Sequence, residues 1–517
     1  MLTYFEYLDF NGAQLFTCVC LPKDKGKFPT VILRSPYVDF ALELSEGDVS
    51  ERVLNENKAY LENGYAVVFQ HCRGCGKSTG EFVPYIFERE DGLFLQGWIR
   101  NQQFYNGELY LVGGSYTASV HYVTAPFAPD IKGAVFEVQD SERYNCNYRN
   151  GIYKMGLHGE WYIQMYKKKS IKNKSFVLDS YNTLPLCDMS RSVLGQSAPE
   201  FDEVLNHPNK DDEFWQTRNG GSDARGAINN AKIPILLTTG AFDLYTGGVF
   251  DMWNSLDKET KEMSALLVHP YDHGGTPMVL PFEFENGRIK EKYGEFMVSW
   301  LNHIRLGGKA PFEVGKVTYY KLFDTWYADD FAPTEKAIEL TLGSKEVTYC
   351  YNPYAPATFK GGLSANFGGT AYQDPPNSRY DIVSVYTDEF ENDLTIKGKM
   401  AVRLRVKSTA ADTCFYVRIS LAKPQGDLGL RDDINQISNL TRSYIPNEEV
   451  EMTFSFDELA CLVHKGEKLR IDISSSAFPH YVRHTNNKGL FSKQETAKIA
   501  YNTVVLEKSK IIIPIED

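Results

Sequence analysis

The segment YLVGGSYTA contains a serine on a predicted tight turn, a position that suits a catalytic nucleophile. Ser115 follows an apolar run typical of a buried strand, and Gly113 and Gly114 precede it. A strained strand-to-helix turn that exposes a nucleophile needs small neighbours, because a bulky side chain would collide with the backbone. The segment therefore predicts a nucleophile elbow. The alternative is a glycine-rich turn with an incidental serine.

A hydrolytic serine needs a base and an orienting carboxylate, and for this type of turn the chain order is Ser, Asp, His. Asp243 in LLTTGAFDLYTGG and His273 in LLVHPYDHGG each follow an apolar strand. Because such strand ends share one edge of a parallel sheet, we predict a triad with Ser115. The alternatives are a helix cap at Asp243 and an ordinary loop histidine. Asp272 adjoins the histidine and Asp251 falls in the next helix, so neither is well placed as the acid.

The segment HCRGCGKSTGEF suggests two other kinds of site. A phosphate-binding loop needs a glycine five positions before Gly76, where His71 stands, so a nucleotide switch is excluded. Cys72 and Cys75 form a single C-x-x-C pair with no second pair at zinc-ligand spacing. One pair cannot fill a tetrahedral metal site, and the role of these two cysteines is left open.

The elements around these residues follow an α/β pattern. Strands are expected over the first forty residues, with a hairpin at Asn11-Gly12. Apolar strands then alternate with helical spacing, in YAVVFQH, IKGAVFEVQ, IPILLTTGAFD and SALLVHPYD. This alternation predicts a parallel sheet with helices on both faces. The chemistry of such a sheet lies in the loops at the carboxyl ends of its strands.

Two segments depart from the α/β pattern. Residues 141–225 are rich in Tyr, Asn and Lys with helical pieces, and are interpreted as a helical cap inserted over the sheet. Residues 315–517 alternate apolar and polar side chains in short runs such as MAVRLRVKS, which predicts an all-β sandwich or jelly roll. The expected α/β domain is thus discontinuous, over residues 1–140 and 226–314.

Composition restricts the function further. A chain of 517 residues is too long to fold around a single hydrophobic core, so two or three domains are expected. Its 43% of apolar residues is enough to fill their cores. A net charge of −12 argues against a nucleic-acid partner. The N-terminus has no signal-peptide pattern, and no apolar run is long enough to span a membrane. Nine scattered cysteines indicate reduced thiols, so a cytoplasmic location is expected. A homodimer is left open.

The chain resembles the cocaine esterase and X-prolyl dipeptidyl-peptidase-like serine hydrolases nearly end to end. The resemblance rests on RSPYVDF, GYAVVFQHCRGCGKSTGEF, GGSYTA, HPNKDDEFW, GAFDLYTGG, HPYDHG and, in the β region, DIVSVYTDEFENDLTIKGKMAVRLRVKSTAADT and ISSSAFPHYVRHTNN. In this family the HCRGCGKSTGEF segment is a glycine-shaped loop. Two departures from the family pattern are Cys72, where an aspartate-like residue is usual, and Ala118, where glycine is usual.

The resemblance implies an α/β-hydrolase fold with a helical cap, followed by a galactose-binding-like jelly roll. It implies the triad Ser115, Asp243 and His273, and an oxyanion hole made by the Tyr37 hydroxyl and the backbone N–H of Tyr116. The expected activity is that of an esterase or acylase that forms an acyl-enzyme, with no metal or organic cofactor. The expected substrate is a small ester, amide or short peptide.

Two alternatives stay open for the activity. One is an X-prolyl dipeptidyl aminopeptidase, although such relatives tend to carry a large extra N-terminal domain and here the hydrolase strands start at once. The other is a catalytically silent carbohydrate-binding protein, since jelly rolls also bind sugars.

Aromatic residues are the candidates for the lining of the substrate pocket. Relatives that prefer α-amino acid esters have a carboxylate cluster after the catalytic aspartate, where this chain has Leu-Tyr-Thr. This difference argues against an amino-group pocket of that type. A separate hypothesis is that aromatic residues of the cap line an apolar acyl or alcohol pocket. Its candidate residues are Tyr153, Trp161, Tyr162 and Phe242, with burial in the core as the alternative.

Overall fold

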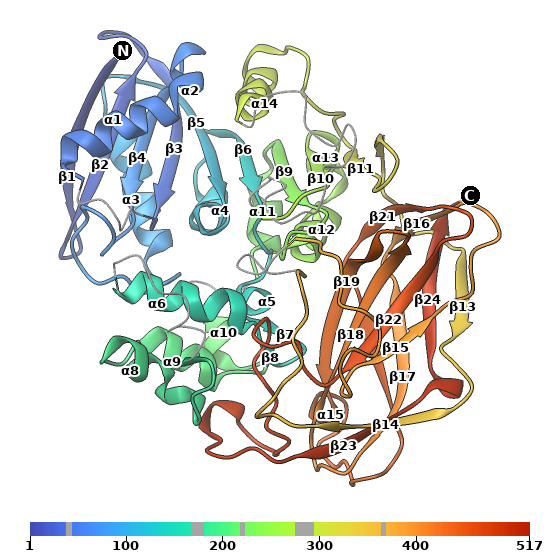
Figure 1. Ribbon diagram of the computed structural model, residues 1–517. Coiled ribbons are helices and arrows are strands. Elements are labelled where there is room, and N and C mark those ends of the chain that lie inside the picture. The colour runs from blue at the N-terminus through green and yellow to red at the C-terminus, as the bar shows by residue number, and fades with distance from the viewer. Residues whose placement is uncertain (38–43, 168–179, 218–222, 274–293, 363–368, 517) are drawn as a thin grey trace.

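The first part of the chain is built around a ten-stranded mixed sheet. The computed structural model describes residues 1–37, 44–167, 180–217, 223–273, 294–362 and 369–516 (Figure 1). The sheet order is β1 (Leu2–Phe10), β2 (Ala13–Leu21), β4 (Ala66–His71), β3 (Phe28–Ser35), β5 (Tyr105–Gly114), β6 (Ile131–Glu137), β9 (Ile235–Gly240), β10 (Ala265–His269), β11 (Val317–Tyr320) and β12 (Trp326–Asp329). The strands from β4 to β11 in this order are parallel to their neighbours, and the outer pairs are antiparallel.

The hairpin predicted at Asn11-Gly12 joins β1 to β2. Both turn residues have positive φ, 44° and 75°, and Phe10 pairs directly with Ala13. Asparagine and glycine tolerate this left-handed conformation better than other residues, which is why the two-residue turn forms here.

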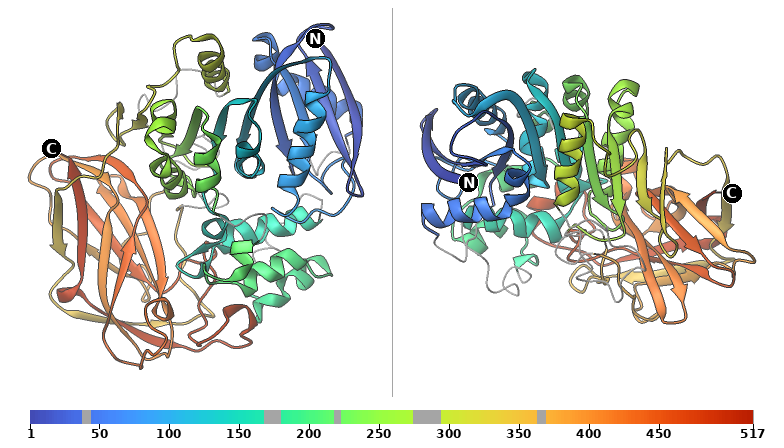
Figure 2. Two further views of the ribbon diagram at one scale, coloured as in Figure 1. Left: turned by 180° about the vertical axis from the view of Figure 1, so that it is seen from behind. Right: turned by 90° about the horizontal axis from the view of Figure 1, so that it is seen from above.

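Helices cover both faces of the sheet, as Figure 2 shows. One face packs against α1 (Glu46–Glu56), α2 (Lys58–Glu62) and α14 (Glu295–Leu306). The other packs against α3 (Glu88–Arg100), α4 (Tyr116–Tyr122), α11 (Arg225–Ala231) and α12 (Thr246–Ser255), and α13 (Lys258–Glu262) precedes β10. The central strands are buried on both sides by these layers, as their continuous apolar runs predict.

A helical cap lies between β6 and β9 in the chain. Its described elements are α5 (Arg143–Asn147), the hairpin β7 (Tyr148–Arg149) and β8 (Ile152–Tyr153), a π-helical turn (Met155–Gly159), α6 (Glu160–Lys167), α8 (Met189–Leu194), α9 (Pro199–Asn206) and α10 (Glu213–Thr217). An aromatic cluster forms its core. Trp161 of α6 stacks on Tyr116 at the start of α4, with ring centroids 5.6 Å apart. The cap therefore covers the carboxyl end of β5.

The C-terminal part is a sandwich of two antiparallel sheets. One sheet contains β14 (Glu346–Tyr351), β23 (Ala500–Val505), β17 (Ala401–Ser408), β24 (Lys510–Glu516), β16 (Leu394–Gly398) and β21 (Leu459–Val463), with β13 (Ala337–Thr341) on β24 and β20 (Val450–Ser455) on β17. The other runs β15 (Val383–Tyr386), β22 (Lys468–Ser474), β18 (Cys414–Lys423) and β19 (Gly426–Gln436), after which comes the short α15 (Ile437–Leu440). Val402, Leu404 and Val406 alternate inward along β17, as MAVRLRVKS predicts.

The fold class expected from the sequence, an α/β-hydrolase with a cap and a C-terminal jelly roll, is the one observed. The first sheet runs beyond residue 315, because β11 pairs with β10 and β12 pairs with β11. The same hydrophobic cluster continues from this sheet into the sandwich, so the two parts are packed together. None of the helices among the described residues is long and apolar enough to cross a membrane.

Candidate active site

Ser115 occupies a strained turn between β5 and α4. Its backbone has φ 55° and ψ −133°, a combination that side-chain-bearing residues rarely adopt. A Cβ atom at Gly113 would overlap the carbonyl oxygen of Thr117, so the turn requires glycine there. The Ser115 N–H donates to the Glu137 carbonyl at 2.9 Å, which anchors the turn to β6. This is the geometry of a nucleophile elbow.

Asp243 and His273 meet at the same edge of the sheet. Asp243 follows β9 and is completely buried, and its Oδ2 lies 2.8 Å from Nδ1 of His273, which follows β10. The other carboxylate oxygen, Oδ1, accepts the backbone N–H of Tyr245 at 2.6 Å. Burial lowers the pKa of His273, but the carboxylate of Asp243, with smaller contributions from Asp272 and Glu137, more than offsets this, so the pKa is raised overall.

Tyr37 reaches the serine from the end of β3. Its hydroxyl lies 3.5 Å from Ser115 Oγ. The residue is partly exposed but its hydroxyl is buried, and this burial raises the pKa of the Tyr37 phenol. Hydrogen bonds with Ser115, the Trp161 side chain and the backbone N–H of Tyr116 lower the pKa in part. The phenol therefore stays protonated, and its hydroxyl lies within hydrogen-bonding reach of both Ser115 Oγ and the Tyr116 N–H.

A small cavity of about 170 Å³ lies next to Ser115 and His273. Ser115 and His273 both line it, together with Tyr37, Tyr85, Tyr116, Gln139, Leu157, His158, Glu160, Trp161, Gln164 and Tyr245. The lining is thus largely aromatic, with a few amide and carboxylate groups. A cavity of this kind can hold the acyl or alcohol part of a small substrate against the serine.

Of the four residues predicted for the pocket, only Trp161 is among the described residues that line this cavity. Tyr153 and Tyr162 are fully buried in the aromatic core of the cap, where each ring lies against Phe201. Phe242 lies in the main core, beneath the guanidinium of Arg431. Tyr162 was misplaced because neighbouring positions on a helix point in different directions, and only packing decides which one faces the cavity. Tyr153 on β8 and Phe242 after β9 were misplaced because residue type does not reveal which side of a buried layer a side chain enters.

Two lining residues that were not among the predicted pocket residues are Tyr245, which contacts His273, and His158, which contacts Tyr245. The ring of Tyr245 packs edge-on against His273 with centroids 5.5 Å apart, and its hydroxyl lies 3.3 Å from Nε2 of His158. His158 is buried, and burial lowers its pKa to about 3, so it is neutral. Tyr245 could have been suspected from its place two residues after the predicted acid. His158 carries no such signal.

Cys72 and Cys75 are in no disulfide bond and are buried in the core next to the turn that carries Ser115. They pack in one cluster with Phe82, Tyr85 and Tyr116. Burial raises the pKa of Cys72 well above its ordinary value, so it is protonated. Their placement is that of small core residues beneath the elbow.

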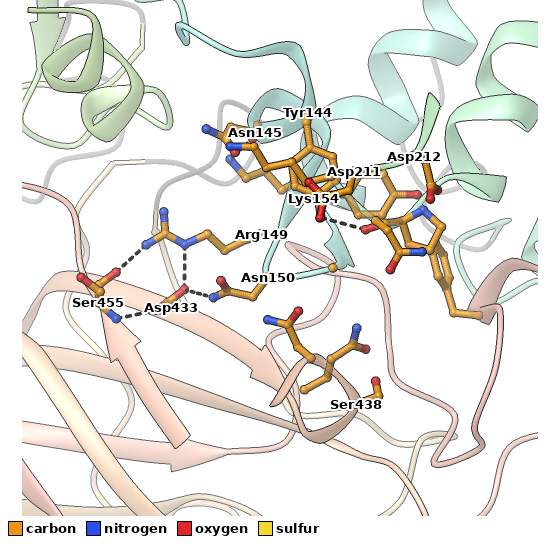
Figure 3. A pocket seen from close by; sticks show the side chains of 18 of the residues that line it. Tyr144, Asn145, Arg149, Asn150, Lys154, Asp211, Asp212, Asp433, Ser438 and Ser455 are labelled. Atoms are coloured by element: carbon orange, nitrogen blue, oxygen red, sulfur yellow. Dashed lines mark hydrogen bonds and ion pairs between the residues drawn. The ribbon is translucent and has the colours of Figure 1, made fainter. Parts of the chain in front are cut away.

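A much larger cleft, of about 1240 Å³, lies between the cap and the sandwich (Figure 3). Arg149 of β7 crosses it to Asp433 of β19 at 2.7 Å and to Asp457 at 3.1 Å, and its guanidinium also donates to the Ser455 carbonyl. Asn150 donates to Asp433 as well. These contacts join the cap to the sandwich.

Comparison with known proteins agrees with this architecture. Residues 11–275 match the profile of the X-Pro dipeptidyl-peptidase (S15 family), and residues 316–510 match that of the X-Pro dipeptidyl-peptidase C-terminal non-catalytic domain. A curated relative, the cocaine esterase of Rhodococcus sp. (strain MB1 Bresler), is 22% identical, with 94% of this chain and 92% of the relative covered.

Solved structures share the whole fold. An aminopeptidase from a marine sediment archaeon, Thaumarchaeota archaeon, superposes with a TM-score of 0.83 at 18% identity, covering 100% of this chain and 96% of that chain. An α-amino acid ester hydrolase superposes with a TM-score of 0.81 at 17% identity and the same coverage.

Proposed function

Because the chain belongs to the X-Pro dipeptidyl-peptidase (S15) family and is a serine hydrolase of ester or amide bonds, we propose that Ser115, His273 and Asp243 are its catalytic triad. His273 takes the proton of Ser115 as Oγ attacks the substrate carbonyl, and an acyl-enzyme forms when the alcohol or amine leaves with that proton. Water then attacks the acyl-enzyme while His273 takes its proton, and His273 returns that proton to Ser115 Oγ as the acid product leaves. Asp243 orients the imidazole and stabilises its cation.

The oxyanion hole is proposed to consist of the Tyr37 hydroxyl and the Tyr116 N–H. Both are donors beside Ser115 Oγ, where the charge of a tetrahedral intermediate would develop. Donors fixed in place before the reaction stabilise that charge without having to reorganise, and this is usually the largest electrostatic contribution in acyl transfer.

One observation carries this proposal. The strained Ser115 opens into the same small cavity as His273, whose other side is held 2.8 Å from a completely buried carboxylate. A structural serine needs neither the strained turn nor the buried pair.

A fluorophosphonate probe and short-chain nitrophenyl esters provide the test. We expect a single covalent adduct on Ser115, located by mass spectrometry, and hydrolysis that is lost in Ser115→Ala. Ser119→Ala is the matched control, because Ser119 lies four residues further along α4 and does not line the cavity among the described residues. An adduct elsewhere, or hydrolysis that survives in Ser115→Ala, would refute the assignment.

A second candidate is X-prolyl dipeptidyl-peptidase activity, which the matched family profiles support by name. An esterase or acylase with an apolar pocket is our first proposal, because aromatic residues dominate the cavity. The ratio of kcat/KM on a nitrophenyl butyrate ester to that on an alanyl-prolyl nitroanilide separates the two. Faster cleavage of the anilide would favour the peptidase.

Three further expectations stand as proposals. The first is the division into an α/β domain (1–140 and 226–314), a cap (141–225) and a jelly roll (315–517), except that β11 and β12 complete the α/β sheet and therefore belong to the first domain. Limited proteolysis can test this division. The second is a cytoplasmic location, which is supported by nine cysteines that form no disulfide bond and can be tested by cell fractionation. The third is that the protein does not bind nucleic acid, which gel-shift measurements can test; whether it is a monomer or a homodimer is open, and light scattering can decide it.

A further inference from the structure

The side chain of Tyr116 has no part in the proposed chemistry, yet both hydrogen-bonding capacities of its hydroxyl are used. The hydroxyl donates to Oε1 of Glu88 at 2.8 Å and accepts the backbone N–H of Tyr85 at 2.8 Å. The residue is only 2% exposed. Because a phenol ring is rigid, fixing the hydroxyl at its far end also fixes the direction of the ring and limits movement of the backbone that carries it.

Glu88 is itself held by the sheet. It is the first residue of α3, and its second oxygen, Oε2, lies 3.0 Å from Nη1 of Arg34 on β3. The same Nη1 donates to the Glu88 carbonyl at 2.9 Å. The arginine is further fixed because its Nε donates to Gln70 of β4 at 3.1 Å. Glu88 and Arg34 are both buried, so water does not compete for these contacts.

The chain of contacts therefore connects the two elements that carry the proposed oxyanion donors. Arg34 lies three residues before Tyr37, on the strand that delivers its hydroxyl. Glu88 joins that strand to the phenol of Tyr116, whose backbone N–H is the second donor. Tyr85, held at a positive φ of 66°, lines the cavity and contacts the same hydroxyl.

We propose that Glu88 and the Tyr116 hydroxyl are positioning groups for the oxyanion hole. They hold the Tyr116 N–H at the place where the charge of the tetrahedral intermediate develops. This inference rests on the proposed function, since it presumes acyl transfer at Ser115. A group that only stabilised the fold would affect unfolding but would not distinguish the transition state from the bound substrate.

The test compares three variants on a nitrophenyl ester and on a boronic acid, which forms a tetrahedral adduct with an active serine. Tyr116→Phe removes the hydroxyl and keeps the ring and the N–H. We expect kcat to fall about tenfold with KM unchanged, since displacing an oxyanion donor should cost part of what deleting one costs. Affinity for the boronic acid should fall by the same factor as kcat.

Glu88→Gln keeps an acceptor for the Tyr116 hydroxyl but loses the charge that holds Arg34. We expect its kcat to lie between those of the wild type and Tyr116→Phe. The matched control is Tyr351→Phe, which deletes another fully buried hydroxyl, one that donates to the His484 carbonyl in the sandwich. It should leave kcat, KM and boronic acid affinity unchanged. If Glu88→Gln fails to fold, the comparison of kcat and boronic acid affinity between Tyr116→Phe and Tyr351→Phe is sufficient to test the positioning role.

The outcomes separate this inference from the proposed function. If the wild type is labelled at Ser115 and Tyr116→Phe keeps the wild-type kcat and boronic acid affinity, only the positioning role is overturned. Equal losses in kcat and in boronic acid affinity, with KM unchanged, support it. Losses that appear in KM alone, or equally in Tyr351→Phe, overturn it in favour of a structural role. A wild type with neither labelling nor hydrolysis overturns the proposed function and this inference together.

Discussion

The backbone N–H of Tyr245 donates a 2.6 Å hydrogen bond to Oδ1 of Asp243. This contact occupies one oxygen of the carboxylate and leaves the other, Oδ2, directed at Nδ1 of His273 at 2.8 Å. The turn after β9 therefore fixes the orientation of the acid through the main chain, two residues beyond it. A buried carboxylate held in this way presents one defined oxygen to the imidazole.

Asp243→Asn should abolish most of the activity without unfolding the protein. The amide can keep the contact to Tyr245 but favours the wrong imidazole tautomer, so we expect kcat on a nitrophenyl ester to fall by about 10⁴. Asp251→Asn is the control, because Asp251 lies on α12 and faces Lys399 at 3.8 Å. Full activity in Asp243→Asn, or a comparable loss in Asp251→Asn, would contradict the assignment of the acid.

The pH dependence should reflect the raised pKa of His273. The imidazole must be neutral to accept the Ser115 proton, and the Asp243 carboxylate raises its pKa above the ordinary 6.5 despite burial, which lowers it. Activity should therefore be lost as pH falls through a value above 6.5. We expect the acid limb of kcat/KM, measured from about pH 5 to about pH 9, to lie there.

The same measurement on Asp243→Asn supplies the check. Removing the carboxylate leaves burial as the main influence, so the acid limb of the residual activity should move to lower pH. An acid limb that lies below pH 6.5 in the wild type, or that does not move in the variant, would mean that another group controls it.

Tyr37→Phe should reduce turnover without destabilising the fold. The hydroxyl lies 3.5 Å from Ser115 Oγ, while the residue as a whole is 39% exposed. Loss of one oxyanion donor should lower kcat by about 10²–10³ with little change in KM or in Tm. Tyr380→Phe, on a residue that is 65% exposed, is the control. Near-normal kcat in Tyr37→Phe would remove it from the oxyanion hole.

Gly113→Ala should disrupt the elbow. Its Cβ would overlap the Thr117 carbonyl oxygen, a backbone atom that cannot move without deforming the turn. We expect the free energy of unfolding to fall by about 2 kcal/mol or more, and fluorophosphonate labelling of Ser115 to be lost.

Gly97→Ala is the matched control for this substitution. Gly97 lies inside α3, and a Cβ there would meet no atom within 4 Å. The change should be neutral or stabilise the protein by up to about 1 kcal/mol, because alanine favours helix. Urea unfolding of both variants makes the comparison, and equal stability would show that the turn at Gly113 tolerates a side chain.

The positions of Ser115, Asp243 and His273 could be predicted from the sequence because their signals are local. Each follows an apolar run that forms a buried strand, and the glycines before Ser115 mark a turn that few other residues can adopt. Parallel strands then bring their carboxyl ends to one edge whatever the details of packing. Their catalytic roles stay predictions until the labelling and kinetic experiments are done.

The choice among the aromatic residues was decided only by the tertiary structure. Trp161 and Tyr162 are adjacent in α6, yet one lines the cavity and the other is buried in the core of the cap. The connection of Tyr116 through Glu88 to Arg34 joins positions that are 28 and 54 residues apart in sequence. Strand order and turns follow from short-range patterns of residue type, whereas side-chain direction and such distant contacts depend on how the layers pack against one another.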